Sequence, residues 1–362
     1  MDVSTADPWN DTSKATSLEH NGAAAPLGDV RATIIQFMRG RFVTPILAQL
    51  GEMGILDRLS VDQLSLMDYP QLTPYVLHSL LSYLQSLALV ETTPEGTWRA
   101  TAIGRKAFQR WGGFAIVDSY EAYFSRLDDL LLSEAKPTDI QVDRKRNVLG
   151  SGQLHARKFF PAALSLLKGA PPGVIVDVGC GDGAFLEAAL SKYPNTTVVA
   201  VDLAAESIKL AYERLASKLR TPWHAAAADG ANVAHWSQAV PRSSQRIVIT
   251  GWFVLHEFCR GSVERARDFL SSVKEHFPTA EILIGEVVKA SPDILSRHFG
   301  RSALPEFQLF HALSGQGLMS WDQFRELRAD MPYVVEAEML IDPIPTAKGN
   351  IPANLIWHLK PG

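Results

Sequence analysis

A glycine-rich segment in the middle of the chain has the residue types and spacing of a nucleotide-binding turn. The segment VIVDVGCGDGAFLEAAL begins with an apolar run, continues through Gly179, Gly181 and Gly183, and ends in a helical pattern. Glycines at such a turn let the backbone bend tightly and approach a ligand closely. Asp202 ends the next apolar run, and an acid in this position binds ribose hydroxyls in nucleotide-binding folds. The pattern therefore predicts a site for a ligand that contains a nucleoside.

Charge distinguishes two ligands of this kind. The spacing also fits NAD, but a pyrophosphate at a helix N-terminus requires positive potential that is not cancelled. Asp182 lies inside the loop, and Asp177 lies two residues before the first glycine. S-adenosylmethionine (SAM) has no phosphate and presents an ammonium and a sulfonium, so carboxylates suit it. We therefore predict SAM rather than NAD, and Asp229 with Gly230, at the end of the third apolar run, is expected beside the adenine.

A His-Glu pair follows the fourth apolar run. The segment ITGWFVLHEF places His256 and Glu257 just past the C-terminal edge of the expected sheet, where ligands bind in open α/β folds. An isolated histidine at a strand end is usually structural, but the position of His256 beside a SAM site makes it a candidate functional residue.

The second half of the chain has the pattern expected of the fold that would position these residues. Apolar runs of strand length alternate with helical patterns, which predicts a doubly wound parallel α/β sheet. Two late runs, 333–341 and 353–359, are expected to pair antiparallel at its edge. The predicted parallel strands are Val174–Val178, Thr197–Asp202, Trp223–Ala227, Arg246–Trp252 and Glu281–Val288.

The first half differs in pattern. Residues 1–28 are rich in small and polar residues and predict a disordered tail. Residues 29–150 are mainly helical, and a helix over Pro74–Leu89 followed by a short hairpin gives the winged-helix order. This helix contains no Lys or Arg, so it has nothing with which to contact phosphates. We therefore interpret 29–150 as a packing or dimerisation domain, not a DNA-binding one, and 151–362 as the SAM-binding domain.

Three motifs carry a family resemblance. The sequences DVGCGDG, VDL and FVLHEF resemble the motif series of class I SAM-dependent methyltransferases, most closely those with the plant-type O-methyltransferase architecture. This resemblance implies a Rossmann-like seven-stranded sheet, preceded by a winged-helix-like dimerisation domain, and hence a homodimer. It also implies that the SAM pocket contains Asp177, Gly179, Gly181, Asp202, Leu203, Asp229 and Gly230.

A second histidine suggests a metal site. His311 lies in a probable helix after the fifth strand, and two histidines with one carboxylate form an arrangement suited to Fe(II). The sequence here is similar to metal-dependent α-keto acid C-methyltransferases, which implies that His256, Glu257 and His311 are catalytic and bind Fe(II) or Zn. Bidentate binding of a 2-oxo acid would acidify its β-carbon and hold the enolate beside the sulfonium. Glu257 departs from the Asp of the iron-binding pattern and leaves the metal's identity open. Alternatively, His311 only packs in the pocket.

Two further residues are candidates for contact with the substrate. Arg157 could pair with a carboxylate, because arginine favours bidentate contact, and Trp252 lies beside the His-Glu pair. The cations at 144–146 fit a solvated linker surface.

Composition restricts the function classes. The 362 residues are 46% hydrophobic and carry 35 Lys and Arg against 39 Asp and Glu, which argues against general nucleic-acid binding. No apolar run is long enough to cross a membrane. Two cysteines, Cys180 and Cys259, cannot form a disulfide framework, so we expect free thiols and a cytoplasmic location.

Three functions remain open. The first is methylation of C3 of a 2-oxo acid by a metal-dependent SAM enzyme, in the biosynthesis of a specialised amino acid or natural product. The second is O-methylation of a small phenol or hydroxyl with His256 as general base. The third is a SAM-binding cyclase or regulator that transfers no methyl group.

Overall fold

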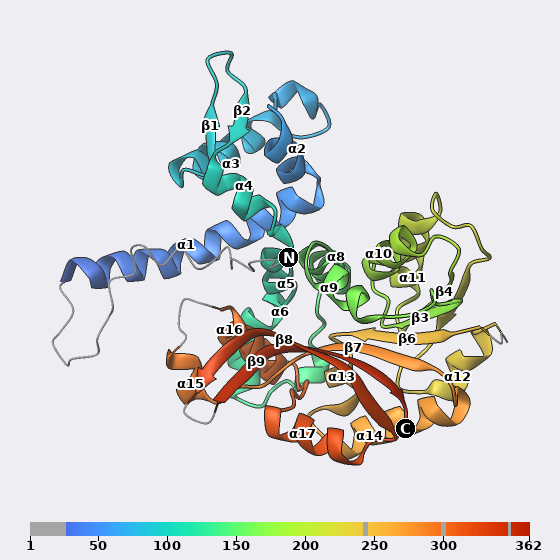
Figure 1. Ribbon diagram of the computed structural model, residues 1–362. Helices are drawn as coiled ribbons and strands as arrows, with labels where there is room; N and C mark the ends of the chain where they lie inside the picture. The colour runs from blue at the N-terminus through green and yellow to red at the C-terminus, as the bar shows by residue number, and fades with distance from the viewer. Residues whose placement is uncertain (1–26, 242–244, 298–301, 347–348) are drawn as a thin grey trace.

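The computed structural model describes residues 27–241, 245–297, 302–346 and 349–362. The tail predicted over residues 1–28 therefore lies almost wholly outside the described residues. A helical N-terminal part stands on an α/β part that contains the large sheet (Figure 1). None of the described helices is long and apolar enough to cross a membrane.

Seven strands form the large sheet, in the order β5-β4-β3-β6-β7-β9-β8. The first five strands in this order pair in parallel, and β9 and β8 add an antiparallel pair at one edge. This confirms the predicted fold, and each parallel strand begins and ends within one residue of its expected bounds. The strands are β3 (Val174–Val178), β4 (Thr197–Asp202), β5 (His224–Ala227), β6 (Ile247–Trp252), β7 (Glu281–Val287), β8 (Tyr333–Thr346) and β9 (Gly349–Pro361).

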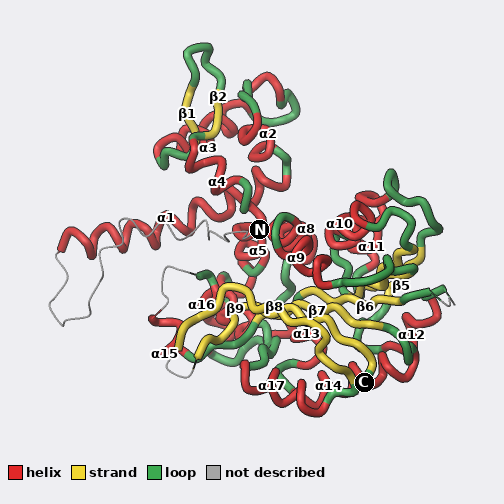
Figure 2. Tube along the Cα trace, viewed as in Figure 1, coloured by secondary structure: helices red, strands yellow, loops and turns green. Residues whose placement is uncertain are grey.

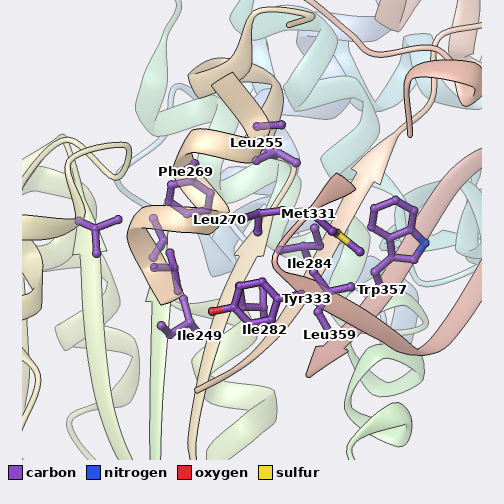
Figure 3. Close-up of a cluster of buried hydrophobic side chains, with 14 of the residues drawn as sticks. Ile249, Leu255, Phe269, Leu270, Ile282, Ile284, Met331, Tyr333, Trp357 and Leu359 are labelled. Carbon is purple, nitrogen blue, oxygen red and sulfur yellow. The ribbon is translucent and has the colours of Figure 1, made fainter. Parts of the chain in front are cut away.

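Helices cover both faces of the sheet, which explains why its central strand β3 is buried at every residue (Figure 2). Helices α9 to α11 pack on one face, and α12, α13, α14 and α17 pack on the other. On the second face Ile249, Leu270 and Trp357 belong to one buried cluster (Figure 3). The helices are α9 (Phe159–Leu166), α10 (Ala184–Lys192), α11 (Ala205–Leu215), α12 (Val233–Trp236), α13 (Leu255–Cys259), α14 (Val263–His276), α15 (Pro292–Arg297), α16 (Leu304–Leu313) and α17 (Trp321–Asp330).

The N-terminal part has a core of its own, which includes Leu47, Leu81 and Phe108. A helix without Lys or Arg, α3, precedes the hairpin β1–β2, in the order expected from the sequence. The winged-helix and dimerisation roles stay predictions. The elements are α1 (Leu27–Glu52), α2 (Ile55–Val61), α3 (Pro74–Ser86), β1 (Val90–Thr92), β2 (Trp98–Ala100), α4 (Ala102–Phe108), α5 (Trp111–Ser119), α6 (Glu121–Phe124), α7 (Leu127–Leu131) and α8 (Arg144–Ala156).

Helix α8 connects the two parts and runs without interruption through residue 150, the expected domain boundary. Near its N-terminus, Arg146 bridges Glu52 of α1 and Asp118 of α5. Towards its C-terminus, Gly152 lies so close to the glycine loop that an added Cβ would be 2.4 Å from an Asp182 oxygen. One helix therefore contacts both the N-terminal core and the loop expected to bind SAM.

Candidate active site

A large cavity of about 1820 Å³ opens at the C-terminal edge of the parallel strands. The ends of β3, β4 and β6 line one part of it. The segment from α5 to α8, helix α16 and the far end of the β8–β9 hairpin line the rest. The position agrees with the rule that ligands of open α/β sheets bind at this edge.

The glycine loop has a backbone that only glycine adopts easily. Gly179, Gly181 and Gly183 have φ values of +74°, +53° and +76°, in the left-handed region where a Cβ is unfavourable. The Gly181 N–H donates to Asp202 Oδ2 over 3.0 Å, and the Ala204 N–H donates to Asp202 Oδ1 over 2.9 Å. These two bonds fix the carboxylate at the end of β4 beside the loop.

Asp177 and Asp182, the two acids at the glycine loop, are both buried and both have a side-chain partner. Asp182 is buried and forms an ion pair with Arg214 of α11. Asp177 is also buried, accepts a 2.6 Å hydrogen bond from Thr250 Oγ1, and has its pKa raised to about 7 by burial. Arg214 therefore offsets the charge of Asp182, on which our choice between SAM and NAD partly depended. Because Arg214 lies far along the sequence, the loop alone could not reveal this partner.

All seven residues predicted for the SAM pocket line the cavity. Leu203 is 64% exposed there, an unusual setting for a large apolar side chain. Asp229 accepts a 2.9 Å hydrogen bond from the Ala231 N–H. Gly230 has no room for a side chain, because a Cβ would lie 2.5 Å from the Phe258 ring. The structure brings these residues together, and their contacts with SAM stay predictions.

The two histidines meet, although 55 residues separate them in sequence. His256 lies in α13 and His311 lies in α16, and both side chains are buried. Their Nε2 atoms are 3.1 Å apart. His256 Nδ1 lies 2.9 Å from Glu286 Oε2, and His311 Nδ1 lies 2.7 Å from the Phe307 carbonyl oxygen. Because a carboxylate and a carbonyl only accept, each Nδ1 donates its proton and each neutral ring has its lone pair on Nε2. Two lone pairs at this distance require a cation between them, either a proton or a metal ion.

The surroundings of the two rings differ in charge. Burial lowers the pKa of His256, but the Glu286 carboxylate more than offsets this effect and the pKa is raised overall. Burial and the charge on His256 lower the pKa of His311 to about 3. A proton held between the rings therefore belongs to His256. Sequence reasoning missed Glu286, although an acid inside the apolar segment EILIGEVV of β7 was a signal that could have found it.

Glu257 points elsewhere. Its carboxylate is on the cavity side, and its Oε1 accepts a long 3.4 Å hydrogen bond from Gln316 Nε2. Among the described residues, no group of three or more His, Cys, Asp or Glu side chains is arranged to hold a metal ion. The three-residue metal cluster is therefore not formed in the structure: the two imidazoles converge, and the carboxylate turns to Gln316. Metal binding stays a prediction.

Of the two residues predicted to contact the substrate, Trp252 lines the cavity and Arg157 does not. Arg157 is not among the residues that line the cavity, and its charge acts on Asp57 of α2 instead. Arg144, assigned to a solvated surface, lines the cavity and has no ion-pair partner within the described part of the chain. Its neighbour Arg146 is tied to Glu52 and Asp118. The helical turn that starts α8 explains the difference, because successive residues there face different directions.

Aromatic side chains line the cavity where β6 ends. Trp252 is buried, lines the cavity, and packs against Phe159 and Phe185. Phe253 has a φ of +55° and stacks on His155 with ring centroids 4.3 Å apart. A left-handed backbone is costly for a bulky residue and marks a position that the surrounding structure enforces. Burial lowers the pKa of His155 to about 4, so this ring is neutral near pH 7.

Both cysteines are free and buried. Burial raises the pKa of Cys180 and of Cys259. Neither thiol is therefore a reactive thiolate near neutral pH.

Comparison with known proteins identifies the enzyme class. A family model described as a methyltransferase domain matches residues 175–270. The chain is 26% identical over 328 residues to the 2-ketoarginine methyltransferase of Streptomyces arginensis, which covers 85% of this chain and 90% of that protein. This chain is a SAM-dependent methyltransferase.

Solved structures agree on the fold of this methyltransferase. An O-methyltransferase family protein from Burkholderia thailandensis has a TM-score of 0.59 at 14% identity and covers 94% of this chain and 99% of its own. Human N-acetylserotonin methyltransferase, solved with SAM, has a TM-score of 0.53 at 14% identity with the same coverage. The resemblance to class I methyltransferases with the plant-type O-methyltransferase architecture is thereby confirmed.

The contact between α8 and the glycine loop yields a first prediction. Gly152→Ala places a methyl group against the Asp182 carboxylate, so the loop must shift. We expect SAM to bind about tenfold more weakly, a loss of about 1.4 kcal/mol, by isothermal titration calorimetry. Gly113→Ala in α5 is the control, because its Cβ would have no atom within 4 Å. Equal SAM affinity in both variants would contradict this role for Gly152.

Asp177 yields a prediction about pH. The folded protein holds its proton up to about pH 7, whereas the unfolded chain releases it near pH 3.8. Its contribution to stability is therefore present at low pH and is lost as pH rises through 7. Relative to wild type, Asp177→Asn should gain on the order of 2 kcal/mol between about pH 5.5 and pH 7.5, measured by urea unfolding. The exposed Asp293→Asn is the control, and a constant difference for Asp177→Asn would disprove the explanation.

Proposed function

We propose that this methyltransferase transfers the methyl group of SAM to C3 of a 2-oxo acid, at a site that holds a divalent metal, Fe(II) or Zn. The supporting observation is the pair of facing Nε2 atoms of His256 and His311, 3.1 Å apart. Each ring donates its other N–H to a fixed acceptor, which is typical of histidines that bind metals.

The donor set fits the proposed metal. His256 and His311 would hold the metal through their Nε2 atoms, since imidazole nitrogen is a donor that both Fe(II) and Zn accept. Glu257 follows His256 directly and lines the cavity, so it is the proposed third ligand, although its carboxylate would have to turn away from Gln316. When bound, the metal supplies Lewis acidity that makes the C3–H of a 2-oxo acid easier to remove.

The protein's own residues would hold the reactants. Glu286 and the Phe307 carbonyl fix the two imidazoles, and Arg144 is the proposed partner of the acceptor carboxylate. In the reaction C3 loses a proton and gains the methyl group, and SAM leaves as S-adenosylhomocysteine. The displacement requires C3, the methyl carbon and sulfur in line. The buried rings of Tyr120 and Phe310, stacked at 4.2 Å, would keep water from this region.

The comparison supports the acceptor class. The name of the Streptomyces arginensis relative contains 2-ketoarginine, which is a 2-oxo acid, and the two chains align over most of their length. We extend to this chain the class of acceptor, and not the particular side chain.

O-methylation is a second candidate, favoured by one contact. The Glu286 carboxylate accepts from His256 Nδ1, which would make His256 a stronger general base. In the structure, however, the Nε2 of His256 faces His311 and not open space in the cavity. This geometry favours the first proposal.

Metal analysis and an acceptor panel test these candidates. Purified enzyme is assayed by elemental analysis and incubated with SAM and either 2-oxo acids or phenols, with and without a chelator. We expect a bound divalent metal, methylation of 2-oxo acids only, and loss of activity on chelation. His311→Ala should lose most of the metal, while His276→Ala on α14, whose Nδ1 bonds only to the helix backbone, should retain it. Phenol methylation without metal would establish O-methylation instead.

We further propose a homodimer that buries the apolar face of α1. The first half of this helix projects from the molecule (Figure 1). Ile34, Phe37 and Phe42 on it are 52%, 65% and 61% exposed, and contiguous apolar exposure of this kind marks an interaction surface.

Phe37→Glu combined with Phe42→Glu places two charges on that face. We expect light scattering to give the mass of one chain, whereas wild type and the Arg39→Glu control give twice that mass. A dimeric double variant would show that another surface forms the interface.

A further inference from the structure

The acceptor side of the cavity has two walls of different chemistry. Lys136, Arg144 and Lys145, together with the acid Asp143, line the wall formed by the segment that leads into α8, so positive charge predominates there. The opposite wall consists of β7, α16 and the β8–β9 hairpin, and apart from His311 its buried members are apolar. A ligand that is anionic at one end and apolar at the other would match both walls.

The hairpin reaches this wall because it is longer than the sheet requires. β9 pairs with β7 only as far as Asn354, opposite Val287. Beyond that point β8 and β9 continue to pair with each other, with Ile344 opposite Ile351. This free end curves towards α15 and α16 (Figure 1). The sequence predicted only the part of the hairpin that belongs to the sheet.

Two hairpin residues are buried against the cavity wall. Ile344 and Ala353 are 5% and 3% exposed and pack in one cluster with Val287 and Leu304. All four line the cavity. Phe307, which packs against the same cluster, stacks on the His311 ring at 4.0 Å. A continuous apolar surface therefore leads from the histidine pair to the end of the hairpin.

This surface discriminates by desolvation. Burying an apolar ligand side chain against this surface is favourable, because no polar group loses its hydration. A charged side chain in the same place would lose its hydration without gaining a partner. On the hairpin, Asp342 is exposed, lines the cavity two residues before Ile344, and is already engaged in an interaction. A cationic side chain would have to reach this residue.

We infer that the acceptor is a 2-oxo acid with an apolar side chain, branched or aromatic, and that Ile344 and Leu304 determine this preference. The inference rests on the proposed function. The acceptor's carboxylate faces Arg144, its reacting carbon lies at the histidine pair, and its side chain extends along Phe307 towards Ile344.

A competition among acceptors tests this inference. The wild-type enzyme is assayed with SAM and four 2-oxo acids: 4-methyl-2-oxopentanoate, 2-oxo-3-phenylpropanoate, 2-oxo-5-guanidinopentanoate and 2-oxoglutarate. We expect kcat/KM for the two apolar acids to exceed that for the two charged acids by about a hundredfold, which equals about 2.8 kcal/mol. A preference for the guanidino acid that Asp342→Asn removes would overturn the inference and leave C3 methylation intact. Methylation of phenols but of no 2-oxo acid would overturn both.

Variants of Ile344 locate the selectivity. Ile344→Ala should reduce kcat/KM for 4-methyl-2-oxopentanoate about tenfold, mainly through KM, and Ile344→Asp should shift the preference towards the guanidino acid. Ile344→Val, which keeps the branched shape, should retain most of the activity. Leu340→Ala on the same strand is the control, because Leu340 is exposed and is not among the residues that line the cavity. SAM affinity should be unchanged in all four, and an unaltered acceptor preference in Ile344→Ala and Ile344→Asp would refute the assignment.

Discussion

The geometry of the active site depends on two hydrogen bonds that fix two imidazoles with their Nε2 atoms facing each other. The Glu286 carboxylate accepts a hydrogen bond from His256 Nδ1, and the Phe307 carbonyl accepts one from His311 Nδ1. Because these acceptors come from β7 and from α16 itself, the sheet and the helix must be correctly packed before the two Nε2 atoms meet. The His256–His311 pair therefore depends on tertiary structure, and it creates a cation-binding position at the C-terminal edge of the parallel strands. Everything proposed about the chemistry follows from the identity of that cation.

In the predicted SAM pocket, three carboxyl groups lie close together beside the glycine loop. Asp182 is neutralised by Arg214, and Asp177 by partial protonation and the Thr250 hydroxyl. Asp202 is held by backbone N–H groups. The three carboxyls therefore play three roles, although they look alike in the sequence. Their separate partners let several acids occupy one small region without mutual repulsion unfolding the loop.

Sequence patterns predicted the parts of the structure that depend on local rules. Each parallel strand was visible as an apolar run because both faces of the sheet are covered, and the glycine turn was visible because left-handed φ values need glycine. What could not be predicted depends on partners distant along the chain. Arg144 lines the cavity and Arg157 does not, although both flank the same helix. Glu286 gains its role only from a histidine on another element.

The site residues show the same limit. His256 and His311 could be paired from the family resemblance, but the turn of Glu257 towards Gln316 depends on how the chain leaves α16. The free end of the hairpin was likewise outside any sequence rule, since residues beyond the sheet have no alternation that identifies their target. Local patterns therefore determine the scaffold, and long-range packing determines which polar groups are available.

Helix α8 has a consequence for how the molecule moves as a whole. It belongs at once to the N-terminal core, through Arg146, and to the wall of the glycine loop, through Gly152. A rigid rod shared by two bodies transmits torque, so a rotation of the first half about this rod displaces the loop, and an occupied loop resists that rotation. By reciprocity, cofactor occupancy and the angle between the halves are thermodynamically linked quantities.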